Sequence, residues 1–107
     1  MSSSPRTVQV GPLSVPLAEG ARIRERRSPS EVVAILDLDT AAVTRREYHE
    51  WATQAGWRLV TSTDHENGWS LVVDNGRDTM IFSCGYMPDQ AQLLLQFESG
   101  DDDSDRE

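Results

Sequence analysis

Three short β-rich runs separated by turn residues constrain the fold of this chain more than any other feature of its sequence. The runs cover residues 57–63, 69–74 and 77–83, and the dipeptide Asn75-Gly76 separates the second run from the third. Asn-Gly between two such runs is the strongest short-range signal for a β-hairpin, because a type I′ turn needs positive φ at both central residues. The sequence therefore predicts a three-stranded antiparallel meander.

The segment before these runs has the pattern of an amphipathic helix. Thr44 and Glu47 have the spacing of a capping box, in which the threonine oxygen accepts a hydrogen bond from the N3 amide and the glutamate reaches back to the cap N–H. Gly56 supplies the left-handed residue at which helices commonly end. The predicted helix covers residues 44–55, and its apolar stripe consists of Tyr48, Trp51, Ala52 and Ala55.

A second helix is predicted over residues 88–97. Gly85 is expected to end the last strand of the meander, and Pro88 suits the first position of a helix. The expected buried side of this helix consists of Ala91, Leu94 and Phe97, widened by Leu93 and Leu95.

The first third of the chain is predicted to add short strands. Residues 7–10 and 13–17 alternate apolar and polar side chains, and the Gly-Pro pair between them suits a tight turn. The apolar run within residues 31–38 predicts a strand that is buried on both faces. Residues 20–30 contain four arginines, one glutamate and a Ser-Pro-Ser breaker, and we interpret them as an exposed connection.

These elements predict one small α+β domain over residues 7–98. In this fold class the three-stranded meander packs against the two helices, and the N-terminal strands extend or flank the sheet. At 107 residues the chain offers room for a single modest core. Residues 1–6 and the acidic tail at 99–107 bury nothing, so we expect both ends to be disordered.

The chain is acidic, and all its basic residues are arginines. It has 18 aspartates and glutamates, ten arginines, no lysine and a net charge of −8. Arginine codons of a GC-rich genome would by themselves explain the missing lysine. Together with the acidic surplus, however, the pattern favours a halophilic, haloarchaeal source, because molar salt shortens the Debye length to about 3 Å and screens like-charge repulsion.

The pattern of apolar residues also indicates the cellular compartment. No apolar run approaches the roughly 20 residues that a membrane helix needs, and the first residues lack an apolar signal segment. We therefore expect a cytoplasmic protein without a membrane partner. A lone cysteine, which can form no internal disulfide, agrees with a reducing compartment.

Asp37 and Asp39 directly follow the apolar run. Their spacing resembles the opening motif of haloacid-dehalogenase-type phosphatases, in which the first aspartate attacks phosphorus, the second handles protons and a threonine follows two positions later. Here that later position holds Ala41, and the chain has no lysine for the family's phosphate clamp. A meander, and not further βα units, is predicted to follow. We therefore interpret the two aspartates as the polar end of a buried strand that leads into the helix.

Histidine and cysteine are present, but their spacing in the sequence indicates no metal or catalytic site. His65 lies between two acids in a predicted hairpin loop, where a zinc or nickel site would need further ligands, and His49 lies on the predicted helix. Cys84 lies at a predicted bend, where a nucleophilic thiol would need a base or a positive field to lower its pKa. Because free cysteines are among the most buried residues, we interpret Cys84 as a core residue. We assign no catalytic residue, metal ligand or cofactor.

One basic cluster remains as a candidate interaction site. It consists of Arg22, Arg24, Arg26 and Arg27, with Arg45 and Arg46 as a possible extension. Nucleic-acid-binding domains usually carry a basic field over a whole face, whereas this chain is acidic overall. Since no catalytic set converges and the flanks have opposite charge, we expect a non-enzymatic protein–protein interaction or assembly module. Its expected partner is a second copy of itself or another protein.

Two alternatives stay open. The first is a nucleic-acid-binding regulator that uses the arginines at 22–27. The second is an enzyme, and its distinguishing feature would be a concave site where Cys84 or Asp37 meets a histidine.

Overall fold

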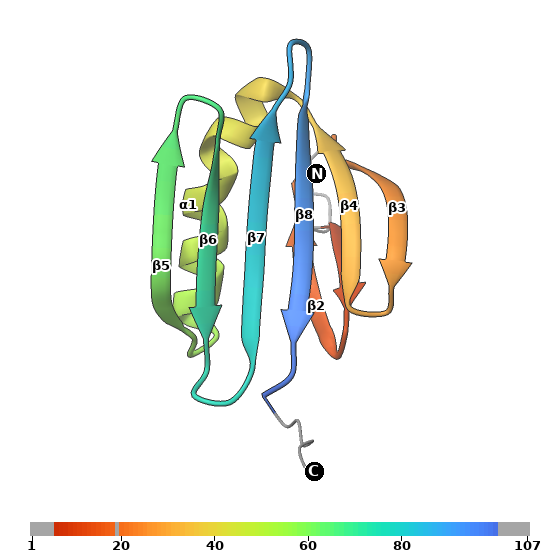
Figure 1. The fold of residues 1–107 in the computed structure, drawn as a ribbon. Coiled ribbons are helices and arrows are strands. Elements are labelled where there is room, and N and C mark those ends of the chain that lie inside the picture. The colour runs from red at the N-terminus through yellow and green to blue at the C-terminus, as the bar shows by residue number, and fades with distance from the viewer. Residues whose placement is uncertain (1–5, 19, 101–107) are drawn as a thin grey trace, which may run out of the picture.

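Antiparallel β-strands build most of this protein, and one helix packs on them (Figure 1). The computed structural model describes residues 6–18 and 20–100. In chain order the described elements are β1 (Arg6–Val10), β2 (Leu13–Leu17), β3 (Arg22–Ser28), β4 (Glu31–Leu36), α1 (Leu38–Gln54), β5 (Arg58–His65), β6 (Gly68–Asp74), β7 (Thr79–Tyr86) and β8 (Ala91–Glu98).

Six of the strands form one sheet in the order β3-β4-β8-β7-β6-β5, and every neighbouring pair is antiparallel. β1 and β2 form a separate hairpin. Figure 1 shows α1 behind β5, β6 and β7, and the β1–β2 hairpin behind the β4 and β8 side of the sheet. Both therefore cover the same face. Within the described residues, no element covers the opposite face of the sheet.

The core lies between the sheet and these covering elements. Strand alternation directs Leu71, Phe82 and Leu93 toward α1 and the hairpin, and all three are fully buried. Tyr48 of α1 stacks on Phe82, with ring centroids 4.3 Å apart. The Trp69 indole N–H donates to the Ala41 carbonyl at 2.9 Å, which satisfies a buried donor and joins β6 to the helix.

The predicted fold class is wrong. The described chain is mainly β, with a six-stranded antiparallel sheet, a two-stranded hairpin and one helix. The predicted meander exists as β5, β6 and β7, but it is only half of the large sheet. The prediction missed the long-range pairing of β4 with β8, which adds the other half.

The second predicted helix, over residues 88–97, is the strand β8. Its apolar residues fit the spacing of a helix and also that of a strand. In the structure the buried positions Ala91, Leu93 and Leu95 alternate with half-buried residues, as in a strand. β8 pairs with β4 on one side and β7 on the other, and this pairing overrides the helix preference of its residues. Pro88 lies in the turn before the strand, and Gly85 does not end β7, which continues to Tyr86.

The first helix exists, but its predicted start is wrong. α1 begins at Leu38, six residues before the predicted cap at Thr44. The Thr44 side chain is 1% exposed, and its hydroxyl donates to the Thr40 carbonyl at 2.6 Å, so it belongs to the helix interior. Asp37 occupies the N-cap position in an extended conformation, without a side-chain capping bond. The chain thus passes from β4 into the helix directly.

The predicted end of this helix is confirmed. Gly56 has a φ of +90°, and the N–H groups of Gly56 and Trp57 donate to the carbonyls of Thr53 and Ala52 at 3.2 and 2.8 Å. These two hydrogen bonds form a Schellman motif, which satisfies two of the last helical carbonyls. Along the predicted stripe, Tyr48 and Ala52 are buried and Trp51 is half-buried, whereas Ala55 is exposed.

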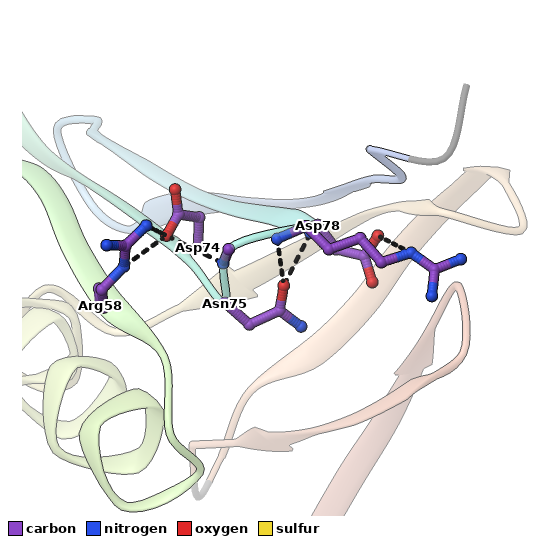
Figure 2. Close-up of polar contacts among 6 residues, drawn as sticks. Arg58, Asp74, Asn75 and Asp78 are labelled. Atoms are coloured by element: carbon purple, nitrogen blue, oxygen red, sulfur yellow. Dashed lines mark hydrogen bonds and ion pairs between the residues drawn. The ribbon is translucent and has the colours of Figure 1, made fainter. Parts of the chain in front are cut away.

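The Asn75-Gly76 hairpin is confirmed, but its turn type is not. Four residues connect β6 to β7, and only Gly76 has positive φ, so this is no two-residue type I′ turn. Figure 2 shows that the Asn75 side-chain oxygen accepts hydrogen bonds from the N–H groups of Arg77 and Asp78, at 2.9 and 2.7 Å. The Asp74 carboxylate pairs with Arg58 at 3.2 Å and fixes the strand end.

In the N-terminal third, most predictions are confirmed. The hairpin of β1 and β2 forms as expected, with Gly11 at a φ of 60° in its turn. β4 is buried on both faces, since Val32, Val33 and Ala34 are each 1% exposed or less. The connection predicted at 20–30 is instead the strand β3, which is exposed as expected but pairs with β4.

Both chain ends were predicted to be disordered. Residues 1–5 and 101–107 lie outside the described residues. Of the predicted disordered residues that the structure describes, Arg6 is the first residue of β1. The Gly100 N–H donates to the Asp78 carboxylate at 3.1 Å. No helix in the described ranges combines the length and apolar character needed to cross a membrane.

Candidate interaction surfaces

The four arginines at 22–27 lie together on β3, which is an edge strand of the large sheet. Three of them are already engaged. Arg24 donates to the Gln92 side-chain oxygen at 2.8 Å and Arg26 to the Pro29 carbonyl at 3.4 Å. Arg27 pairs with Glu25 and Glu31 at 3.6 and 3.4 Å. These contacts neutralise part of the positive field that the sequence predicts.

Arg45 and Arg46 do not extend this cluster. Both lie on α1, and Arg45 donates to the Ser62 hydroxyl at 2.9 Å and pairs with Asp64 at 3.6 Å. Ser62 and Asp64 belong to β5, the edge strand on the other side of the sheet. The six predicted arginines therefore do not form one surface, because Arg45 contacts the edge strand opposite β3.

β5 forms an edge of a different character. It pairs with β6 only, and seven of its eight residues are exposed. Leu59 and Val60 are 48% and 55% exposed, the two highest values among the large apolar residues of the described chain. A bulge between Leu59 and Thr61 displaces one end of the strand, whereas residues 61–65 keep a regular register with β6. The β5 edge is thus an unpaired strand that is regular over residues 61–65, and its two exposed aliphatic side chains lie at the bulge.

The β3 edge has the features that prevent strand addition. Five of its seven residues are charged, and two register irregularities interrupt its pairing with β4. Charged side chains and bulges are the common means by which proteins protect an edge strand from pairing with another chain. The two edges of the sheet therefore differ: β5 has one irregularity and fewer charges than β3, and its regular run over residues 61–65 is the more open to a further strand.

A shallow hollow of about 510 Å³ lies on the uncovered face of the sheet. Ser70, Ser83 and Leu94, which line it, alternate with core residues along β6, β7 and β8, so their side chains point to the uncovered face. The remaining lining residues are His65, Asn67, Trp69, Cys84, Gly85, Tyr86, Met87 and Gln92. The sequence contained no signal for this hollow, because it exists only where three strands and two turns meet.

Cys84 and His65 both line this hollow, yet they do not form a nucleophile and base. Cys84 is 6% exposed and belongs to the hydrophobic core, as predicted. Burial raises the pKa of its thiol to about 11. Because only the thiolate is an effective nucleophile, the protonated Cys84 thiol is unreactive at neutral pH. Strand alternation also places it on the covered face, together with Trp69 and Leu93.

The other polar candidates lie apart. Asp37 and Asp39 are exposed at the N-terminal end of α1, where the strand passes into the helix as interpreted. His49 lies on the outer side of α1 beside Glu50 and Thr53. Residues 6–18 and 20–100 contain no group of three or more His, Cys, Asp or Glu side chains arranged to hold a metal ion.

Comparisons of this chain with protein-family models, with curated protein sequences and with solved structures find no significant match. The surfaces described above are therefore the basis for any functional assignment. Sequence reasoning missed the β5 edge, although its exposed pair Leu59-Val60 was within the predicted meander. Which strand forms an edge depends on the order of all six strands, and no local pattern encodes that order.

Proposed function

We propose that this protein is a non-enzymatic assembly module that self-associates through the β5 edge. The observation that carries the proposal is the unpaired outer side of β5, with Leu59 and Val60 exposed beside it. Unpaired N–H and C=O groups of an edge strand are a template for pairing with another strand. Burial of the two aliphatic side chains would add to the free energy of association, at roughly 25 cal/mol per Å² of apolar area.

A second copy of the chain suits this edge because of its charge arrangement. β5 has Arg58 at one end, and Asp64 and Glu66 lie at the other. Two antiparallel copies related by a two-fold axis bring Arg58 of each copy toward Asp64 and Glu66 of the other. Arg58 and Asp64 already have ion-pair partners in their own protomer, so this contact would extend existing ion pairs. A two-fold contact uses the same patch on both subunits, which is the commonest arrangement in soluble homo-oligomers. The result would be one continuous sheet across both subunits.

The mass of the native particle tests this proposal. We expect sedimentation equilibrium in molar KCl to give twice the chain mass of 12.0 kDa. The variant Val60→Glu should sediment as a monomer, because a charge on an edge strand opposes pairing. Since Val60 is 55% exposed, the substitution should leave the protomer folded, which a circular dichroism spectrum checks.

Two matched variants serve as controls, because each places the same new charge at another exposed aliphatic residue. Val43→Glu lies on α1 and Ile23→Glu on the β3 edge, and both residues are 43% exposed. We expect both variants to remain dimeric. A wild-type protein that is monomeric at every concentration, or dissociation by Ile23→Glu alone, would contradict association through β5.

Nucleic-acid binding through β3 is the second candidate. It is supported by four arginines on one exposed strand, two of which, Arg22 and Arg26, make no ion pair within the described residues. Gel shifts at increasing KCl, with the β3 arginines replaced by serine, separate this function from assembly. Phosphate contacts weaken steeply with salt, whereas apolar strand pairing does not.

A further inference from the structure

The hollow on the uncovered face of the sheet has the size and position of a ligand site. It lies at the end of the sheet where the β5–β6 and β7–β8 turns stand (Figure 1). Strand residues such as Ser83 and Leu94 form its floor, and His65 at the end of β5 borders it together with Asn67 and Met87 of the two turns. Its volume of about 510 Å³ falls within the range of small-molecule pockets, roughly 300–1,000 Å³.

Gly85 lies in this hollow, and nothing inside the protomer requires a glycine there. Its φ is not positive, and a Cβ atom at this position would meet no atom within 4 Å. Its register partner Gly68 differs, since it has a φ of +149° and an added Cβ would collide with the Cys84 carbonyl oxygen. A glycine inside a strand weakens it and often marks the close approach of a ligand or another backbone. The open space above Gly85 therefore points to a molecule from outside the chain.

The lining of the hollow carries no aspartate, glutamate or arginine. This is notable because charged residues make up 26% of the chain. The lining itself therefore offers an ionic ligand no carboxylate or guanidinium partner. The hollow therefore favours an uncharged ligand.

Hydrogen-bonding groups are nevertheless available around it. Among the described residues, the side chains of His65, Asn67 and Ser83 form no hydrogen bond or ion pair with one another or with any other residue. Leu94 and Met87 add apolar surface. The complementary ligand is a flat, uncharged group with hydrogen-bonding atoms at its edge.

We propose that the hollow binds an uncharged aromatic heterocycle of the nucleobase type, lying flat over Gly85 with its edge toward Ser83, His65 and Asn67. The heterocycle has two sources, a free nucleoside or a base of single-stranded nucleic acid. Arg24 donates to Gln92 of the lining, so a guanidinium stands next to the hollow for a phosphate of the second source. This site is separate from the β5 edge and does not depend on self-association.

Nuclear magnetic resonance titration of the full chain tests the site, in molar KCl and, for the oligonucleotide, also at 0.1 M KCl, because phosphate contacts weaken with salt. The probes are adenosine and uridine, which are uncharged, and a short single-stranded oligonucleotide. We expect saturable amide shifts that centre on residues 83–87. Gly85→Phe fills the hollow and should weaken binding by about tenfold or more, a loss of about 1.4 kcal/mol. Gly85→Ala places one methyl group where the ring approaches the backbone, so we expect a smaller loss than for Gly85→Phe, of about threefold.

A third variant identifies the source of the heterocycle. If the oligonucleotide binds more tightly than the nucleosides and Arg24→Ser removes only that gain, the ligand is a base of a nucleic-acid strand. If the oligonucleotide has no advantage, the ligand is a free heterocycle. Absence of saturable shifts at residues 83–87 in the wild-type protein with every probe would overturn the proposal, as would shifts that persist in Gly85→Phe. The wild-type titration decides the matter even where a variant fails to fold, and the particle mass is measured separately.

Discussion

Burial changes the acid–base chemistry of single side chains in this protein. It raises the pKa of the Cys84 thiol from an ordinary 9.0 to about 11. Burial also raises the pKa of Tyr48, with smaller effects from Glu47 and Cys84. The Tyr48 hydroxyl has no hydrogen-bond partner among the described residues, so its ring contributes through stacking on Phe82. Both groups act as core residues in their neutral forms.

We expect the melting temperature to fall as pH rises from about 9 to about 11. In this window the unfolded chain loses the Cys84 proton while the folded chain retains it, so ionisation favours unfolding. The stabilising effect of the neutral thiol is complete below pH 9. Cys84→Ala should make the fall shallower, although it lowers the melting temperature at neutral pH by leaving a cavity. Thermal melts from pH 7 to pH 11 check this, and an unchanged slope in the variant would exclude the thiol as the cause.

Single residues were predicted well where a local pattern determines their environment. The burial of Cys84, Tyr48 and Ala52 follows from residue type and helical spacing. Thr44 was misjudged, because its spacing from Glu47 fits a capping box, whereas its burial against the sheet depends on tertiary packing. A buried threonine within a helix commonly bonds the carbonyl four residues before it, as Thr44 does.

Among the elements, α1 was predicted correctly at its C-terminal end and wrongly at its N-terminal end. Its end depends on the positive φ of Gly56, which residue type alone indicates. Its start has no side-chain cap, and the helix follows β4 after a single residue. Such a start carries no sequence signal because packing against the sheet, not capping, stabilises the first turns.

Replacing the glycine at this helix end should destabilise the protein measurably. We expect Gly56→Ala to lower the free energy of unfolding by about 1 kcal/mol, because alanine is strained at a φ of +90°. Gly85→Ala is the matched control, since its φ is not positive and an added Cβ meets no atom. Urea unfolding followed by Trp fluorescence measures both variants, and equal losses would show that backbone conformation at residue 56 has no special role.

β8 shows why an element of ambiguous period cannot be assigned from its own residues. Ala91 and Leu94 fit a helical stripe, while Ala91, Leu93 and Leu95 fit a strand. The presence of β4 and β7 on its two sides decides between them. β7 directly precedes β8, but β4 lies about 60 residues away, so no local window contains both neighbours.

At the scale of the whole molecule, the acidic surplus predicts salt-dependent stability. We expect the melting temperature to rise steeply as KCl increases from 0.1 M to molar concentrations. Over this range the Debye length falls from about 10 to about 3 Å, so the repulsion within a chain of net charge −8 is screened. Sucrose of equal osmolality, which screens no charge, should raise the melting temperature less. Full stability in dilute buffer would remove the halophilic interpretation.

The candidate surfaces are likewise properties of the whole molecule. The arginines at 22–27 were visible in the sequence, but their separation from Arg45 and Arg46 follows from the strand order. The β5 edge and the hollow beside Gly85 arise from the same order. Sequence patterns identified chemically distinctive residues, whereas the fold decided which of them share a surface.

The position of β8 also governs when the protein can complete its fold during synthesis. Among the described elements this strand comes last, yet it lies in the middle of the sheet between β4 and β7. Until the ribosome releases residues 91–98, the β3–β4 hairpin and the β5–β6–β7 meander have no strand to join them. The six-stranded sheet can therefore be complete only after this late strand has joined its two halves.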